Sequence, residues 1–368
     1  MLTHFSMTNA DIKELINSCR EGANDGEISL LIEHIAIIPD DRQESLWHEN
    51  IIEASQIIKK NKGLLDAIKM LQDTYKSWPI HYPSSYAHKT DILKTLCHMQ
   101  IEAKQYSHAH HTMNRYIYNA LKQVSANTPL SKMHYFSFRS FSDYALEDIK
   151  EERISLTHPR DFNDPLDTIL TWWLENQIQI EKDEAKLKYK LIMKKSVEHI
   201  KIRCMIGSKY TNNDGVTIDR TIEDLSVLMW AHYANGHTGF CVEYDLEDSK
   251  LHISGVEDEN KVDLIKAIKY VPLININDAP SMEIALFHKS DFWAYENEMR
   301  LCSFDATSNE EHPTIGCKGA IKAIYLGAKC SEINRRKMEQ AIADKDIPLY
   351  QMSVDITNLT RFKKMQIG

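Results

Sequence analysis

The sequence predicts an α+β protein in which an N-terminal all-α helical-repeat region is followed by a mixed-sheet α+β domain. Residues 8–124 carry apolar side chains at helical spacing almost throughout. After a polar stretch, β-rich segments and helices intermix without a steady strand–helix period. A chain of 368 residues is also long for one hydrophobic core. We therefore expect a helical region at 1–125, a linker at 126–132 and an α+β domain at 133–368.

Composition is that of an ordinary globular protein, with 43% hydrophobic and 26% charged residues. The formal net charge of −9 does not favour binding to the phosphates of nucleic acids. The seven cysteines are scattered and form no C-x-x-C motif, which indicates reduced thiols in a reducing cytosol. No signal peptide and no membrane-spanning run is recognisable. A cytoplasmic protein without a membrane partner is expected.

Apolar stripes predict antiparallel helix pairs in the N-terminal half. One stripe begins at Ile51 and another at Leu64, and the polar break Asn61–Gly63 between them has the usual length for such a pair. A second pair is expected at roughly 86–103 and 106–123.

Two segments of these helices resemble the tetratricopeptide repeat. In residues 103–121, Ala103, Tyr106 and Ala109 take the places of the small residue, the aromatic and the alanine that fix close helix packing in that repeat. Residues 62–76 are similar. The two segments lie further apart than the repeat's usual spacing of about 34 residues, so the array is degenerate. The resemblance implies a surface that binds a protein or peptide partner.

In the C-terminal half, composition and turn signals predict strands and helices in an irregular order. The expected strands are 134–140, 153–159, 201–210, 240–245, 268–273, 298–304 and 320–328, and the expected helices are 141–152, 172–200, 222–234 and 331–343. Thr221 and Asp224 form a capping box at the start of the third of these helices. The long charged helix near 172–200 is interpreted as an insertion.

The first candidate site segment is the strand that ends at Arg139 and Ser140. Alternation places Arg139 on one face of the strand and Phe136 and Phe138 on the other. Arginine offers a planar, charged fork for phosphate or carboxylate. A surface arginine at a sheet edge would give the same pattern.

The second segment is the turn around Pro165. Asn163 or Asp164 before this proline favours a turn in which the side chain bonds its own backbone. The turn also presents Asp164 and Asp167 as a polar pair. A purely structural turn is the alternative.

The third segment places His232, Tyr233 and His237 around one helix-to-strand corner, where Gly239 allows close approach of the backbone. Histidine there can act as an acid, a base or a metal ligand. Alternatively, each histidine braces the turn by bonding a backbone carbonyl.

The fourth segment, residues 289–304, is interpreted as a strand on which Glu296, Glu298 and Arg300 share one face. Two neighbouring carboxylates flanked by a guanidinium suit general acid–base work or the orientation of a ribose hydroxyl. A cross-strand ladder of ion pairs is the structural alternative.

Together these segments resemble a bacterial family catalogued as domain of unknown function 2971. The matching motifs are Arg-Ser at 139–140, F-N-D-P at 162–165, H-Y-x-x-x-H-x-G-F at 232–240 and Y-E-x-E-x-R at 295–300. The resemblance spans roughly 133–345. Members look like accessory genes of mobile elements and phage-defence neighbourhoods, which implies an effector of such a system.

Our first functional hypothesis is a transferase that uses NAD as its substrate and is similar in layout to ADP-ribosyltransferases. In it, Arg139 grips the pyrophosphate and Tyr233 or His232 packs against the nicotinamide. Glu298 bonds the ribose as the oxocarbenium ion forms, since a fixed carboxylate contributes most where positive charge develops. Beyond NAD, the cofactor is unknown.

Two hypotheses of other classes stay open. One is a hydrolase or nuclease, with or without a metal ion, that uses His232, His237, Asp164 and Glu296. The other is a non-catalytic sensor or adaptor that binds a protein through the helical repeats. No phosphate-binding loop or dinucleotide fingerprint is present.

Over all hypotheses, the predicted catalytic residues are Glu298, His232 and Glu296, and the predicted substrate-binding residues are Arg139, Ser140, Asn163, Asp164, Tyr233, His237 and Arg300. No metal-ligand set is predicted. The histidines at 108, 110 and 111 cannot all converge on one ion along a helix.

Overall fold

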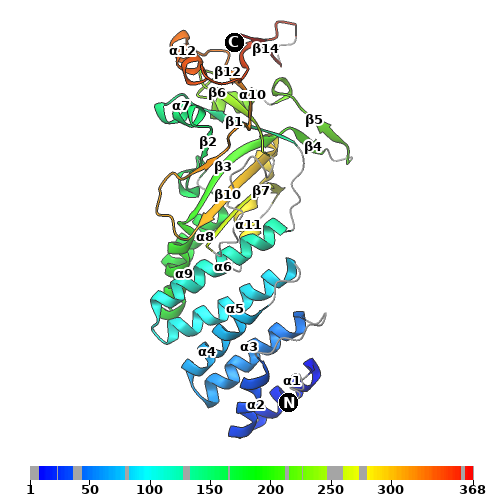
Figure 1. Ribbon diagram of the computed structural model, residues 1–368, viewed down its shortest axis with the longest axis vertical. Coiled ribbons are helices and arrows are strands. Elements are labelled where there is room, and N and C mark those ends of the chain that lie inside the picture. Colours follow the sequence, from blue (N-terminus) through cyan, green and yellow to red (C-terminus); the bar gives the residue numbers. More distant parts are fainter. Residues whose placement is uncertain are drawn as a thin grey trace.

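The N-terminal helices and the sheet lie at opposite ends of an elongated molecule (Figure 1). The computed structural model describes residues 8–22, 24–35, 44–78, 83–126, 133–164, 166–211, 215–225, 227–246, 260–272, 280–357 and 361–367. Helices come first and a mixed sheet with interspersed helices follows, so the predicted α+β class is confirmed. None of the described helices is long and apolar enough to cross a lipid bilayer.

In the part of the N-terminal half that the structure describes, there are six helices. They are α1 (Asn9–Gly22), α2 (Asp25–Ile35), α3 (Glu44–Asn61), α4 (Leu64–Ser77), α5 (Pro83–Glu102) and α6 (Tyr106–Ala126). The break between α3 and α4 falls where the sequence predicts it. Ile51, Ile58 and Leu71 are buried between the helices as expected, but Leu65 is 63% exposed. Leu65 is exposed because the buried stripe of α4 repeats every three or four residues, through Leu64, Ile68 and Leu71, and Leu65 falls beside it.

Eight strands form the main sheet. In spatial order they are β14 (Phe362–Gln366), β13 (Leu349–Val354), β12 (Ile321–Leu326), β6 (Phe240–Asp245), β1 (His134–Arg139), β3 (Ile200–Gly207), β10 (Glu298–Asp305) and β7 (Lys261–Ala267). The β12–β13 pair is parallel and the other neighbouring pairs are antiparallel. The strands β7, β13 and β14 are not among those that the sequence predicts.

Three short ribbons and several helical segments complete the C-terminal half. The ribbons pair β2 (Arg153–Ser155) with β11 (Thr314–Gly316), β4 (Lys209–Thr211) with β5 (Thr217–Asp219), and β8 (Lys269–Val271) with β9 (His288–Ser290). The helical segments are α7 (Asp143–Lys150), η1 (Pro159–Asp161), α8 (Ile169–Ile180), α9 (Glu184–Val197), η2 (Ile222–Asp224), α10 (Val227–Tyr233), α11 (Met282–Phe287), η3 (Asp291–Glu296) and α12 (Glu332–Ala341).

Several predicted boundaries are wrong for local reasons. The single helix expected near 172–200 is two helices, α8 and α9, because Asp183 caps a new helix by accepting a hydrogen bond from the amide of Lys186. The capping box of Thr221 and Asp224 is present, but it opens the short η2 turn. The predicted linker, apart from Ala126, lies outside the described residues.

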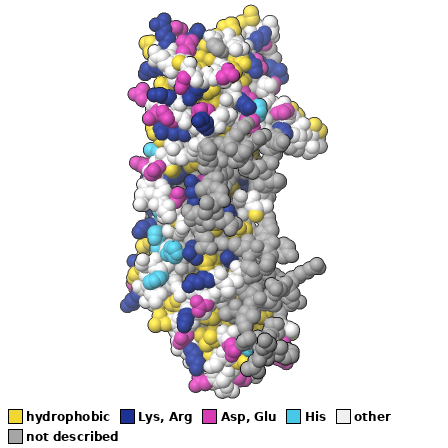
Figure 2. Space-filling model, in the orientation of Figure 1, with side chains coloured by type: hydrophobic (Ala, Val, Ile, Leu, Met, Phe, Trp, Pro, Cys, Tyr) yellow, Lys and Arg dark blue, Asp and Glu magenta, His cyan; other side chains and the backbone are white. Residues whose placement is uncertain are grey.

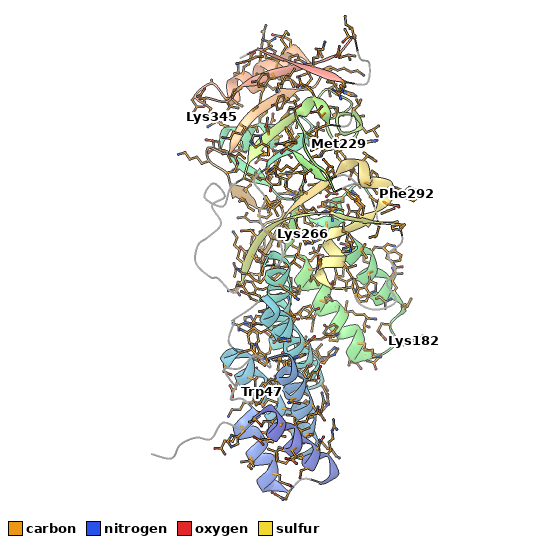
Figure 3. All side chains as sticks on the ribbon, turned by 90° about the vertical axis from the view of Figure 1, so that its right-hand side faces the viewer. Trp47, Lys182, Met229, Lys266, Phe292 and Lys345 are labelled. Carbon is orange, nitrogen blue, oxygen red and sulfur yellow. The ribbon has the colours of Figure 1, made fainter. Side chains whose placement is uncertain are left out.

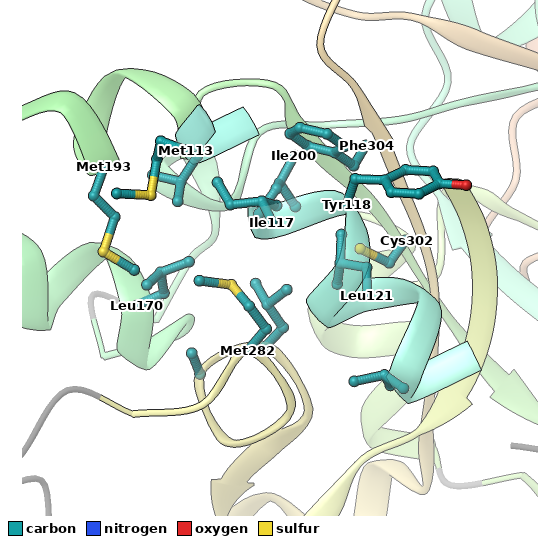
Figure 4. Packing of buried hydrophobic residues seen from close by; sticks show 14 of the residues in the cluster. Met113, Ile117, Tyr118, Leu121, Leu170, Met193, Ile200, Met282, Cys302 and Phe304 are labelled. Atoms are coloured by element: carbon teal, nitrogen blue, oxygen red, sulfur yellow. The ribbon is translucent and has the colours of Figure 1, made fainter. Parts of the chain in front are cut away.

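Helices cover both faces of the sheet. On one face, which we call the cavity face, α6, α8, α9 and α11 pack over β3, β7 and β10, and α10 packs over β1 and β6. On the opposite face, α7 and α12 cover the sheet. Figure 4 shows Ile117 and Leu121 of α6 turned toward Cys302 of β10. The last N-terminal helix is therefore also a covering layer of the sheet.

This shared core makes a testable prediction about stability. Replacing the fully buried Ile117 of α6 by alanine should cost about 2–5 kcal/mol, because the cavity left behind removes packing between α6 and the sheet. Ser107→Ala on the exposed side of the same helix is the control and should change stability by less than about 0.5 kcal/mol. Urea unfolding measures both. Equal midpoints for the two variants would contradict the packing of α6 against the sheet.

Candidate functional site

A cavity of about 310 Å³ opens on the cavity face of the sheet. Its lining comes from β1, β3, the turn before α8, α10, β9, η3 and the start of β10. Acidic side chains and aromatic rings dominate the lining: Asp161, Asp164, Asp167, Glu296 and Glu298 are the acids, and Phe136, Phe138, Phe162, Tyr233 and Trp293 are the rings. We call it the carboxylate cavity.

Lys289 lies at the floor of this cavity and contacts three carboxylates. Its Nζ donates to Glu296 Oε2 at 2.8 Å and to Glu298 Oε2 at 3.1 Å, and it lies 3.3 Å from Asp167 Oδ2. The ammonium also lies 4.9 Å from the centre of the Trp293 ring. The side chain is almost fully buried, so these contacts replace its hydration.

Arg300 lies fully buried beneath the floor and pairs with two of the same carboxylates. Its Nε donates to Glu298 Oε1 at 2.6 Å, and its Nη2 donates to both oxygens of Asp167, at 2.7 and 2.5 Å. Its Nη1 donates to the carbonyl oxygen of Leu286 in α11 at 2.6 Å. The planar guanidinium thus holds α11 and the turn before α8 at fixed positions against β10.

Local backbone geometry brings Glu296 and Glu298 together. Residues 291–296 form the 3-10 segment η3, and β10 begins only at Glu298. Between them Asn297 has a φ of 46°, a left-handed turn that asparagine tolerates better than most residues. The strand predicted for 289–304 is therefore wrong in its first half. The two carboxylates meet at Lys289 because the chain turns there, and they do not alternate along one strand.

Tyr233 closes the cluster from α10. Its hydroxyl donates to Glu296 Oε1 at 2.5 Å, so both oxygens of Glu296 accept a hydrogen bond. Burial and the neighbouring Glu296 carboxylate raise the pKa of Tyr233, so the phenol stays protonated as a donor.

Glu298 stays ionised in this environment. Burial opposes its charge, but the Arg300 guanidinium and the Lys289 ammonium outweigh burial and lower the pKa of Glu298 from 4.5 to about 2. Conversely, burial works against the charge of Lys289, yet Glu298, Asp167 and Glu296 together raise its pKa. A carboxylate with so low a pKa does not take up a proton near neutral pH, so it suits stabilisation of positive charge better than acid–base work.

The thiol of Cys204 in β3 is accessible from the cavity, and its surroundings disfavour the thiolate. Burial and the adjacent Glu298 carboxylate raise its pKa well above the ordinary value. The reactive form of cysteine is the thiolate, which these surroundings suppress.

Five of the residues predicted from the sequence line the cavity, and Arg300 lies beneath it. The lining residues are Asn163, Asp164, Tyr233, Glu296 and Glu298. The turn at 163–167 also has the predicted structural form, since Asp164 Oδ1 accepts a hydrogen bond from the amide of Leu166 at 2.9 Å. Asp164 therefore braces its own turn while it faces the cavity.

Arg139 lies on the other side of the sheet. Strand alternation turns Phe136 and Phe138 of β1 into the cavity and sends Arg139 to the opposite face. There its Nη2 pairs with the fully buried Asp148 of α7 at 2.8 Å, and Asp148 also accepts from Arg153 and Ser155. Its assignment to the substrate site has no support in this arrangement. Ser140, just after the strand, is exposed and also lies outside the cavity lining.

The two predicted histidines likewise lie outside the cavity lining. His232 is exposed at the end of α10, with its ring 6.2 Å from that of Tyr233. His237 adopts a φ of 72° in the turn that follows, and its amide donates to the carbonyl oxygen of Trp230. Gly239 is required in this turn, because a Cβ there would overlap the carbonyl oxygen of Arg139. Of the three predicted residues in this segment, Tyr233 therefore lines the cavity, whereas His232 and His237 belong to the turn between α10 and β6.

Lys289 and Trp293 are the main site residues that the sequence predictions lack, and Asp167 is named there only as the polar partner of Asp164. A lysine beside an aromatic run reads as a surface residue, because nothing local indicates that three carboxylates surround it. The Y-E-x-E-x-R motif is a signal that could have indicated Lys289. Its two carboxylates, Glu296 and Glu298, lie near one arginine, so a second cation is needed to balance their charge.

The comparisons with known proteins cover part of this site. The sequence model of a family described as "Protein of unknown function (DUF2971)" matches the stretch from Met229 to Leu301. This stretch contributes Tyr233, Lys289 and the Glu296–Arg300 segment, whereas Asp167 and Cys204 precede it. The helices α1–α6 match no repeat family. No curated protein and no solved structure matches the chain.

Histidine side chains gather on the surface near α5 and α6 (Figure 2). Among the residues that the structure describes, no three histidine, cysteine, aspartate or glutamate side chains are arranged to hold a metal ion.

The low pKa of Glu298 predicts a pH-dependent stability. Because the folded-state pKa lies below the unfolded value, the ionised group stabilises the fold fully above pH 4.5, and this contribution is lost as the pH falls toward about 2. Glu298→Gln should therefore be less stable than wild type near neutral pH, and the difference should shrink steadily from pH 4.5 downward. Urea unfolding at a series of pH values measures it.

Glu310→Gln on the exposed loop after β10 is the matched control, and its small effect should not vary with pH. If the cost of Glu298→Gln were the same at pH 7 and pH 3, the buried ion pairs would not stabilise the folded state as described.

Proposed function

We propose that the carboxylate cavity recognises a planar organic cation. The observation that carries this proposal is the charge at the floor of the cavity. Among the described residues, the three carboxylates of Asp167, Glu296 and Glu298 pair there with two cations, Lys289 and Arg300. One further positive charge would balance this buried cluster, and the field of a cleft with one excess sign attracts the opposite charge.

The walls favour a flat cation over a compact one. Phe136, Phe138 and Phe162 line the cavity beside Trp293, and aromatic faces attract organic cations. The cavity itself already demonstrates such pairing, since Lys289 lies against Trp293 and the Arg300 guanidinium lies 5.5 Å from the Phe162 ring. At about 310 Å³, the cavity matches the lower end of small-molecule sites.

A second candidate, N-glycosyl transfer from NAD, is favoured by the position of Glu298. The oxidised nicotinamide ring is a planar cation, and a carboxylate that is ionised at neutral pH beside the ribose would stabilise the oxocarbenium ion as the C1′–N bond breaks. Nicotinamide would leave with the bonding pair, and the acceptor would bond C1′ and lose its proton. The pyrophosphate would need a holder other than Arg139. An effector role in bacterial defence is a proposal that rests on the resemblance alone.

The hydrolase or nuclease hypothesis gains less from the geometry, because His232 and His237 do not line the cavity with Asp164 and Glu296. The adaptor hypothesis concerns the surface of α1–α6 and is independent of the cavity.

The cation proposal predicts a difference between two ligands of the same shape. N-methylnicotinamide that carries its methyl group on the ring nitrogen is a pyridinium cation. It should bind at least about tenfold more tightly than neutral nicotinamide, because only the cation gains from the carboxylates and the rings. Glu296→Gln should reduce this preference, and Glu310→Gln should not. Isothermal titration calorimetry measures both ligands with wild type and with each of the two variants. Equal affinity of the two ligands for wild type would refute the proposal.

The NAD candidate has its own test. Incubation with NAD should release nicotinamide, and Glu298→Gln should abolish the release at an NAD concentration that saturates wild type, because the loss lies in the transition state. Chromatography of the products measures it. Wild-type protein that binds N-methylnicotinamide but leaves NAD intact would remove this candidate and keep the cation site.

A further inference from the structure

Three large apolar side chains, which we call the rim, stand exposed directly beside lining residues of the carboxylate cavity in the chain. Phe292 is 87% exposed, Leu166 60% and Leu228 46%. Phe292 lies in η3 next to the lining residue Trp293. Leu166 lies in the turn before α8 next to Asp167, and Leu228 lies in α10 next to Met229. Figure 3 shows Phe292 at the edge of the molecule, pointing away from the ribbon.

Such a rim is not required for a small ligand. Single exposed apolar residues are common on protein surfaces, but several of them beside one cleft indicate a site that a partner molecule covers. Phe292 carries the strongest signal, because its neighbour Trp293 turns inward to the cavity while Phe292 itself contributes nothing to the core. Two adjacent aromatic residues therefore face two different surfaces: Trp293 faces the cavity and Phe292 faces the solvent.

We propose that the planar cation is the guanidinium of an arginine side chain in a polypeptide, with the apolar residues next to that arginine packed on Phe292, Leu166 and Leu228. This inference rests on the proposed function and narrows it to one substrate class. The acidic cavity supplies the charge complementarity, and the rim supplies the contact area that a side chain alone would lack.

Arginine fits this cavity better than lysine for a geometric reason. A guanidinium forms two parallel hydrogen bonds to a carboxylate and stacks on aromatic faces, whereas an ammonium is a point charge with a firmly held hydration shell. Arg300 already pairs with two of the carboxylates from below, through Nη2 to both oxygens of Asp167 and through Nε to Glu298. An entering arginine would meet the same kind of partners from above, with the Asn163 amide exposed at the mouth as a further polar contact.

The docking site proposed here is distinct from the helical-repeat surface, where the sequence predicts a protein partner. The two differ in position, since the rim belongs to the C-terminal half, and they differ in chemistry, since the rim surrounds an acidic cavity. Substitutions at the rim therefore leave the helical surface unchanged.

The test uses a fluorescent pentapeptide, Gly-Leu-Arg-Leu-Gly with blocked ends, and its twin in which citrulline replaces arginine. Citrulline keeps the shape and loses the charge. Fluorescence anisotropy with the full-length protein should give at least about tenfold tighter binding of the arginine peptide, and Phe292→Ser should weaken that binding by about tenfold. Phe292→Ser should leave the affinity for N-methylnicotinamide unchanged, because the rim does not touch a ligand inside the cavity.

Ile356→Ser is the matched control, since Ile356 is also 87% exposed and lies between β13 and β14, outside the cavity lining. Equal binding of the two peptides, or an arginine-peptide affinity that Phe292→Ser leaves unchanged, overturns the inference. Binding of N-methylnicotinamide without binding of either peptide also overturns it but keeps the proposed function. Loss of both ligands means that the proposed function itself has failed.

Discussion

The buried ion network around Lys289 and Arg300 is the interaction on which the C-terminal half depends. Its two cations and three carboxylates come from β9, β10, η3 and the turn before α8, and a backbone carbonyl of α11 joins them. Buried charges are costly alone, so each member is stable only while its partners stay in place. The network therefore positions the cavity walls and holds together segments far apart in the sequence.

The helix α6 connects this network to the N-terminal half. Its buried face packs on α5 at one side and on β7, α9 and α11 at the other, so the helical region is continuous with the layer that covers the cavity face. The cavity opens where this layer ends and α10 begins. A partner that binds the helices and a ligand that enters the cavity would thus act on one connected body.

Each face of the sheet carries a cluster of carboxylates and cations, but the two clusters differ in their balance of charge. On the face covered by α7 and α12, Arg139, Arg153 and Ser155 enclose the Asp148 carboxylate, and this cluster reads as structural support. On the cavity face, carboxylates exceed cations and aromatic rings stand beside them. The excess of negative charge next to an accessible space is what makes one cluster a candidate site and the other a brace.

The sequence by itself determined the fold class, the helix pairs of the N-terminal half and the strands β1, β6 and β10, because apolar periodicity and β-rich composition are local properties. The sequence also names Tyr233, Glu296, Glu298 and Arg300 as candidates, and the structure brings these four side chains together. Only the tertiary structure decided which strand face meets the cavity, and hence that Arg139 lies on the wrong side. The same holds for Lys289, whose role arises from three carboxylates brought to it by folding.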